Sequence, residues 1–212
     1  MWHRTAALGS PGSGKSTLGL SYPGVEQHTW GSSEEDTALG FVGRTDILPP
    51  LKMDWFDCLT LEERAKFTDE KVNEVEIGVL TKKARAKNIA RYRRYLYALK
   101  ADLLAGKRPE VKTIFLDNFT PFSLDFQDYV EIVYANEFLT EKGNFNSIKF
   151  SIKYQQEISD FLRFLVSLPC HVVLSCHVSM AVDEETAAKV NFMQDTQKGI
   201  RYPKEWQPLI MG

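Results

Sequence analysis

The sequence lacks an apolar run long enough to cross a membrane. A membrane-spanning helix needs about 18 or more consecutive apolar residues, and the longest apolar runs here are far shorter. Residues 1–4 also lack the apolar stretch of a secretory signal peptide. These absences predict a soluble, cytoplasmic protein that has no membrane partner.

Cysteine pairs and a strong net charge are lacking too. The three cysteines are an odd number without C-x-x-C spacing, which argues against a disulfide framework and against a zinc site. We interpret Cys58, Cys170 and Cys176 as packing residues in a reducing compartment. The formal net charge is -2, so the charge of the whole chain neither favours nor excludes a polyanionic partner.

Internal repeats, low-complexity tracts and obvious linkers are absent as well, so we expect the 212 residues to form a single domain. Apolar segments typical of buried strands alternate with segments of helical period, which predicts an α/β fold with a mainly parallel sheet flanked by helices. We expect strands at residues 5–8, 25–30, 111–117 and 171–176, and helices at residues 16–20, 82–105, 122–138 and 148–165. An insertion is expected at about residues 37–108, with loops and short helices up to residue 80.

Apolar residues mark two of the predicted helices, and in the first of them they recur at spacings of three and four. Gly106 is the expected stop of the first of these helices. The face of the first consists of Ile89, Tyr92, Leu96, Leu99 and Leu103. The face of the second consists of Ile148, Ile152, Ile158, Phe161, Leu162 and Leu165.

The first strand leads directly into a glycine-rich segment that matches G-x-x-x-x-G-K-S/T at every fixed position. Glycines let the backbone wrap closely around phosphate, and its N–H groups supply fixed positive dipoles. Lys15 should reach the β and γ phosphates, and the Ser16 hydroxyl should bind Mg²⁺. A glycine-rich turn is the alternative. The predicted ATP-binding residues are Gly9, Ser10, Pro11, Gly12, Ser13, Gly14, Lys15, Ser16 and Thr17.

A carboxylate, Asp117, ends the apolar strand predicted at residues 111–117. This is the usual pattern of the second acidic element in ATPases that carry such a loop. We expect Asp117 to hold Mg²⁺ through water beside Ser16. The alternative is an aspartate that merely starts a turn.

Residues 117–120 read D-N-F-T and resemble the D-S-x-T step that follows this strand in RecA-like ATPases, with Asn118 in place of the serine. With the glycine-rich loop, residues 168–177 and residues 208–212, they make the chain similar to short phage-encoded RecA-like ATPases of DNA recombination and single-strand annealing. The resemblance implies a RecA-like P-loop NTPase domain and a Mg²⁺-dependent ATPase acting in recombination, repair or replication. It also implies single-stranded DNA as a partner, a homo-oligomeric ring or filament, and a location in the host cytoplasm.

The same resemblance implies further catalytic residues. His177 follows the last predicted strand, where related recombinases place a glutamine that senses the γ-phosphate, although a core or capping histidine is the alternative. A glutamate that polarises the attacking water matches Glu35, which we favour over Glu34, or both are solvated loop charges. Lys198 and Arg201 are candidates for completing the site of a neighbouring subunit, against ordinary solvated charges.

Residues 82–108 contain ten basic residues and a single acid, Asp102, a local balance of +9. Tyr92, Tyr95 and Tyr97 interleave with them, a combination that suits backbone phosphates and base stacking. The alternative is a solvated helix face that balances the acidic residues between positions 34 and 76. The basic residues are Lys82, Lys83, Arg85, Lys87, Arg91, Arg93, Arg94, Lys100, Lys107 and Arg108.

Two other functions share the glycine-rich loop. A nucleotide or small-molecule kinase needs an acceptor site and usually an arginine-rich lid. The long separation between Lys15 and Asp117, and the further strand after Asp117, are more typical of ATP-hydrolysing motors. A nucleotide-gated DNA-binding adaptor with little turnover is the third alternative.

Overall fold

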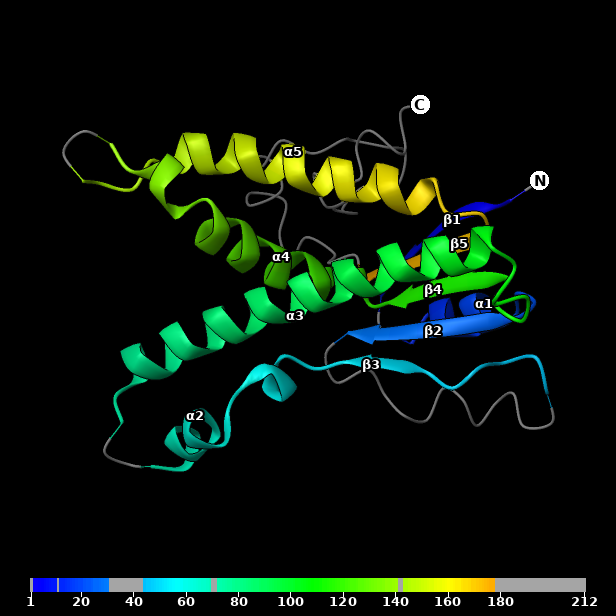
Figure 1. The fold of residues 1–212 in the computed structure, drawn as a ribbon, viewed down its shortest axis with the longest axis horizontal. Coiled ribbons are helices and arrows are strands. Elements are labelled where there is room, and N and C mark those ends of the chain that lie inside the picture. Colours follow the sequence, from blue (N-terminus) through cyan, green and yellow to red (C-terminus); the bar gives the residue numbers. More distant parts are fainter. Residues whose placement is uncertain (1, 11, 31–43, 70–71, 141–142, 178–212) are drawn as a thin grey trace.

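The computed structural model describes residues 2–10, 12–30, 44–69, 72–140 and 143–177 (Figure 1). They form an α/β fold around a five-stranded, all-parallel sheet with the strand order β1-β5-β4-β2-β3. The predicted fold class is therefore confirmed at the level of a parallel sheet flanked by helices. The strands are β1 (Arg4–Gly9), β2 (Val25–Trp30), β3 (Leu51–Met53), β4 (Thr113–Asp117) and β5 (His171–His177).

The helices lie on both faces of the sheet. In Figure 1, α3, α4 and α5 lie in front of the sheet and α1 lies behind it. The α-helices are α1 (Lys15–Leu20), α2 (Leu61–Ala65), α3 (Glu74–Leu104), α4 (Phe119–Val133) and α5 (Ser147–Val166). Short 3-10 turns are η2 (Trp55–Cys58), η3 (Lys66–Thr68) and η4 (Ala135–Phe138).

The side chains of the central strand β4 contribute to a core on each face of the sheet, because successive side chains of a strand point to opposite sides. Ile114 and Leu116 belong to the larger core beneath α3, α4 and α5. Phe115 belongs to the smaller core beneath α1. A Cβ on Gly19 of α1 would lie 2.4 Å from the Phe115 ring, so only glycine allows α1 to approach the sheet this closely.

Helix α3 starts earlier than the apolar period predicts. Asn73 caps it by accepting a hydrogen bond from the backbone N–H of Glu76, and this polar first turn lies before the apolar face begins. The predicted face is confirmed: Ile89, Tyr92, Leu96 and Leu99 are buried and Leu103 packs against the core. The predicted stop at Gly106 is confirmed as well, with a φ of 68°.

Strand β3 was not predicted. It pairs with β2 at an edge of the described sheet, with His28 beside Leu51 and Trp30 beside Met53. Three residues are too few for a period of two to be recognised. The short helices expected in the same region are present as η2, α2 and η3.

The apolar face of α5 was predicted too long. Ile158, Phe161, Leu162 and Leu165 are buried, but Ile148 and Ile152 are 72% and 54% exposed. On the same turns Tyr154 is buried in the larger core and Phe150 packs against it. Ile148 and Ile152 therefore lie on another side of the helix, since Ile152 is six positions before Ile158 and a helix repeats its face every three or four residues.

Two of the cysteines, Cys170 and Cys176, are buried in the larger core, as predicted for packing residues. Cys58 is partly exposed. Among the described helices, none combines the length and the apolar character that crossing a membrane requires.

Candidate functional site

The loop between β1 and α1 needs glycine at two places. Gly12 and Gly14 have φ values of 75° and 83°, in the left-handed region that other residues rarely adopt. Gly14 is also the N-cap of α1, so its conformation sets the direction in which the helix leaves the loop. Pro11 lies outside the described residues. The sequence G-x-x-x-x-G-K-S thus forms a tight strand-loop-helix turn.

Lys15 folds its side chain back over this loop. Its Nζ donates hydrogen bonds to the backbone oxygens of Gly9, at 3.0 Å, and Ser10, at 2.6 Å, and lies 3.3 Å from Ser13 Oγ. The residue is only 8% exposed. Burial lowers the pKa of the ammonium, and the Asp117 carboxylate partly offsets this effect. A cation is thus held against the loop that the sequence predicts to bind phosphate.

The structure brings Ser16 and Asp117 together. Ser16 lies at the start of α1 and Asp117 at the carboxyl end of β4, and Ser16 Oγ donates a hydrogen bond to Asp117 Oδ2 at 2.9 Å. A hydroxyl and a carboxylate are hard oxygen ligands that suit Mg²⁺, which takes its other ligands from phosphate and water. No cluster of three or more His, Cys, Asp or Glu side chains suited to a metal occurs among the described residues. Ser16 and Asp117 are thus two neighbouring oxygen groups that could hold a Mg²⁺ ion.

Two further residues contact Asp117, and sequence reasoning missed both. Gln27 of β2 donates from Nε2 to Asp117 Oδ2 at 3.1 Å. Ser175 of β5 donates from Oγ to Asp117 Oδ1 at 2.5 Å. No pattern in the sequence singles them out, because their position depends on β2 and β5 lying on either side of β4.

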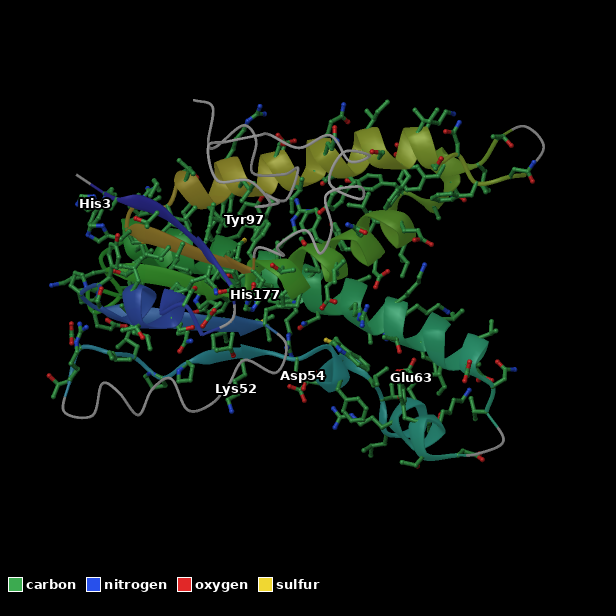
Figure 2. The ribbon with its side chains drawn as sticks, turned by 180° about the vertical axis from the view of Figure 1, so that it is seen from behind. His3, Lys52, Asp54, Glu63, Tyr97 and His177 are labelled. Carbon is green, nitrogen blue, oxygen red and sulfur yellow. The ribbon has the colours of Figure 1, made fainter. Side chains whose placement is uncertain are left out.

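His177 lies at the same edge of the sheet. It pairs in register with Gly9, at the end of β5, and its backbone N–H donates to Thr120 Oγ1 at 3.2 Å. The residue is exposed, so it is not a core histidine. Figure 2 shows His177 at the opposite end of the strands from His3. Burial and the charge of Lys15 lower the pKa of His177 while Asp117 acts in the opposite direction, which favours a neutral imidazole at pH 7.

Several predicted site residues fall outside the described residues, and the structure does not bear on them. These are Pro11, Glu34, Glu35, Lys198 and Arg201, together with residues 208–212, which contributed to the family resemblance.

Most of the basic residues on and after α3 have partners within the chain. Lys82 pairs with Glu131 at 2.9 Å, and Arg93 lies 3.6 Å from Glu157. Ion pairs or side-chain hydrogen bonds within the chain are also made by Arg85, Arg91, Lys100, Lys107 and Arg108. Lys83, Lys87 and Arg94 are exposed and lie along one side of α3. Much of the local positive charge therefore has hydrogen-bond or ion-pair partners within the chain.

The three tyrosines among these basic residues differ in exposure. Tyr92 is fully buried in the core, so the prediction that it could stack on a base is wrong. Tyr95 is partly buried and donates its hydroxyl hydrogen bond to Glu26. Tyr97 is 55% exposed, and its ring centroid lies 4.4 Å from that of Phe164 in α5. Of the three rings, that of Tyr97 is the most accessible to a ligand.

A buried polar network lies between β2 and α3, away from Asp117. Glu26 Oε1 is 2.9 Å from His28 Nε2, and Arg108 donates to Glu26 Oε2 at 2.6 Å. The other ring nitrogen of His28, Nδ1, is 2.7 Å from the Tyr92 hydroxyl. Burial on its own would raise the pKa of Glu26, but hydrogen bonds from His28, Tyr95 and Arg108 lower it to about 2.

Comparisons of the chain with protein-family models, curated proteins and solved structures gave no significant match.

Proposed function

We propose that this chain is a RecA-like P-loop ATPase that binds ATP with Mg²⁺ at residues 9–17 and hydrolyses it. The observation that carries the proposal is the hydrogen bond of 2.9 Å between Ser16 Oγ and Asp117 Oδ2, beside the Lys15 ammonium on the glycine-rich loop. Residues that are 101 positions apart in the chain meet where a phosphate-bound Mg²⁺ would need a hydroxyl and a carboxylate. The position at the carboxyl ends of parallel strands is also where α/β folds bind their ligands.

Each residue would have a separate role. Lys15 exchanges its contacts with Gly9 and Ser10 for the β and γ phosphate oxygens, and stabilises the charge that develops there. Ser16 would bind Mg²⁺ through its hydroxyl and Asp117 would hold the ion through water, and the bound ion would supply charge neutralisation at the phosphates. His177 is exposed and pairs in register with Gly9, and the proposal assigns it the role of sensing the γ-phosphate on the family resemblance. The proposal assigns the orientation of the attacking water to Glu35, on the family resemblance alone.

Measuring phosphate release from ATP, with and without Mg²⁺ and single-stranded DNA, tests this function. Mg²⁺-dependent release that single-stranded DNA stimulates is the expected result. ATP binding without phosphate release would favour the nucleotide-gated adaptor. Phosphate transfer to an added small molecule or nucleotide would favour the kinase.

Replacing Asp117 with alanine should reduce Mg²⁺-dependent turnover by about 100-fold or more, the usual cost of removing one group that stabilises the transition state. ATP affinity should fall much less, because Lys15 and the loop remain. Asp117→Asn, which keeps the shape and removes the charge, should show the same loss. Steady-state phosphate release and equilibrium nucleotide binding separate the two effects.

The matched control is Asp160→Ala, since Asp160 is an exposed aspartate on α5 whose partner is Arg163. This variant should keep the parent turnover. Parent-like turnover of Asp117→Ala would instead remove Asp117 from the site.

Single-stranded DNA is the proposed partner, and the exposed residues Lys83, Lys87 and Arg94 are its proposed contacts. Reversing all three to glutamate should weaken DNA binding and lower the slope of log K against log salt by about 2, since each single-strand phosphate contact contributes about 0.7. ATP affinity should not change. Fluorescence anisotropy with a labelled oligonucleotide at several salt concentrations measures both quantities.

A triple reversal of Lys112, Lys149 and Arg163 changes the net charge equally and serves as the control, because these residues are also exposed but lie off α3. Equal losses in both triple variants would point to a general charge effect instead of a binding surface on α3. The homo-oligomeric ring or filament and the cytoplasmic location implied by the resemblance belong to the same proposal.

A further inference from the structure

The carboxylate of Asp117 is held by side chains from three different elements. Ser16 of α1 and Gln27 of β2 both donate to Oδ2, at 2.9 and 3.1 Å. Ser175 of β5 donates to Oδ1 at 2.5 Å. Asp117 itself is 6% exposed. The carboxylate can therefore rotate only by breaking hydrogen bonds on both of its oxygens.

The sheet topology explains how Gln27 and Ser175 reach Asp117. Strand β4 lies between β5 and β2, so the two donors approach from the neighbouring strand on either side. Leu174 pairs with Leu116, which puts Ser175 alongside Asp117. Thr29 pairs with Asp117, and Gln27 lies two positions earlier on the same face of β2.

The number of donors limits what Asp117 can still bind. An ionised carboxylate offers about two acceptor positions on each oxygen. Ser16 and Gln27 fill those of Oδ2, and Ser175 fills one on Oδ1. One position on Oδ1 remains, and it is the one through which Asp117 could accept a hydrogen bond from a water molecule of the Mg²⁺ shell.

We infer that Gln27 and Ser175 are positioning residues for Mg²⁺: they orient Asp117 so that one carboxylate position faces the ion that Ser16 binds. This inference rests on the proposed function. Groups that orient a metal-binding side chain typically change metal affinity by about 10- to 100-fold when they are removed. Neither residue needs to touch the ion or the nucleotide for this effect.

The test uses Gln27→Leu, which keeps a side chain of similar size and removes the amide. The Mg²⁺ concentration for half-maximal binding of a fluorescent ATP analogue should rise by about 10-fold or more. Binding of the same analogue in EDTA should not change, because the loop and Lys15 are intact. Ser175→Ala should shift the Mg²⁺ requirement in the same direction.

Two controls separate positioning from a structural effect. Gln127→Leu changes a glutamine of α4 with similar partial burial and should keep the parent Mg²⁺ requirement. In an Asp117→Ala background, Gln27→Leu should have no further effect, because the amide acts only through the carboxylate.

The outcomes are distinct. A parent protein that shows no Mg²⁺-dependent binding of the analogue would overturn the proposed function and this inference together. If the parent binds as expected but Gln27→Leu and Ser175→Ala keep its Mg²⁺ requirement, only the positioning role is overturned. Loss of analogue binding in EDTA, or a further effect of Gln27→Leu in the Asp117→Ala background, would also overturn that role alone.

Discussion

Lys15→Ala protein is expected to lose most of its affinity for ATP while keeping its fold. The Nζ contacts are made to Gly9 and Ser10 of the loop, and Lys15 belongs to neither hydrophobic core. Hydrogen bonds to charged groups contribute roughly 1.5–3 kcal/mol each. Losing contacts to two phosphate groups should therefore raise the Kd for ATP by about 100-fold or more.

Equilibrium titration with a fluorescent ATP analogue measures this change, and circular dichroism with thermal unfolding checks the fold. Lys149→Ala is the matched control, since Lys149 is an exposed lysine on α5. Unchanged nucleotide binding by Lys15→Ala would contradict the assignment of residues 9–17 as a phosphate-binding loop.

Glu26→Ala should lower the unfolding free energy by about 2 kcal/mol or more, since each buried polar group left without its partner costs about 1–3 kcal/mol. Glu26 accepts hydrogen bonds from Tyr95, Arg108 and the His28 ring within the buried network. Removing the carboxylate leaves the buried His28 Nε2 and the Tyr95 hydroxyl without this partner, while Arg108 keeps its contact with Glu110. Such uncompensated groups cost more than the cavity alone.

Urea denaturation measures the loss. Glu62→Ala, which removes an exposed carboxylate on α2, should stay within about 0.5 kcal/mol of the parent. A loss of less than 1 kcal/mol in Glu26→Ala, within the range of one ordinary hydrogen bond, would mean that the network does not contribute as its geometry indicates.

The same network gives the stability a dependence on pH. The pKa of Glu26 is lowered from 4.5 to about 2 in the folded chain, so folding favours the ionised carboxylate. Its contribution to stability is therefore fully present above pH 4.5 and is lost as the pH falls towards 2. In Glu26→Gln the unfolding free energy should fall less steeply than in the parent over this window.

The loop and the carboxylate of the candidate site could be predicted from the sequence because each is a local pattern. Residues 9–16 match a known spacing, and Asp117 ends an apolar run. Once the strands are taken as parallel, their carboxyl ends must meet at one edge, which brings Asp117 and His177 to the loop. This meeting of Asp117, His177 and the loop can be predicted without knowing the strand order.

Gln27 and Ser175 could not be predicted, because they depend on which strands are neighbours. A glutamine and a serine within strand segments carry no local pattern that indicates a partner. Strand order results from packing over the whole domain, where residues 90 and 58 positions away in the chain come within hydrogen-bonding distance of Asp117.

The apolar period also says little about partners across the core. The period places Tyr92 on the buried face of α3. The position of Tyr92 among arginines and lysines in the sequence nevertheless suggests a surface that could bind nucleic acid. In the fold, Arg93 pairs with Glu157 and Arg108 pairs with Glu26. These positive charges therefore make separate contacts within the chain and do not form one continuous basic surface.

The three hydrogen bonds to Asp117 imply that the two parts of the candidate site, the Asp117 carboxylate and the Lys15 ammonium, differ in how far they are preorganised. Ser16, Gln27 and Ser175 lose their side-chain freedom when the chain folds, so the carboxylate half is preorganised and binding need not order it again. The Lys15 ammonium, in contrast, is held by the backbone oxygens of Gly9 and Ser10, and under the proposed function it would have to exchange them for phosphate oxygens. Reorganisation on binding would thus fall on the lysine, and the affinity for a nucleotide would reflect the competition between its phosphates and the loop's own carbonyl groups.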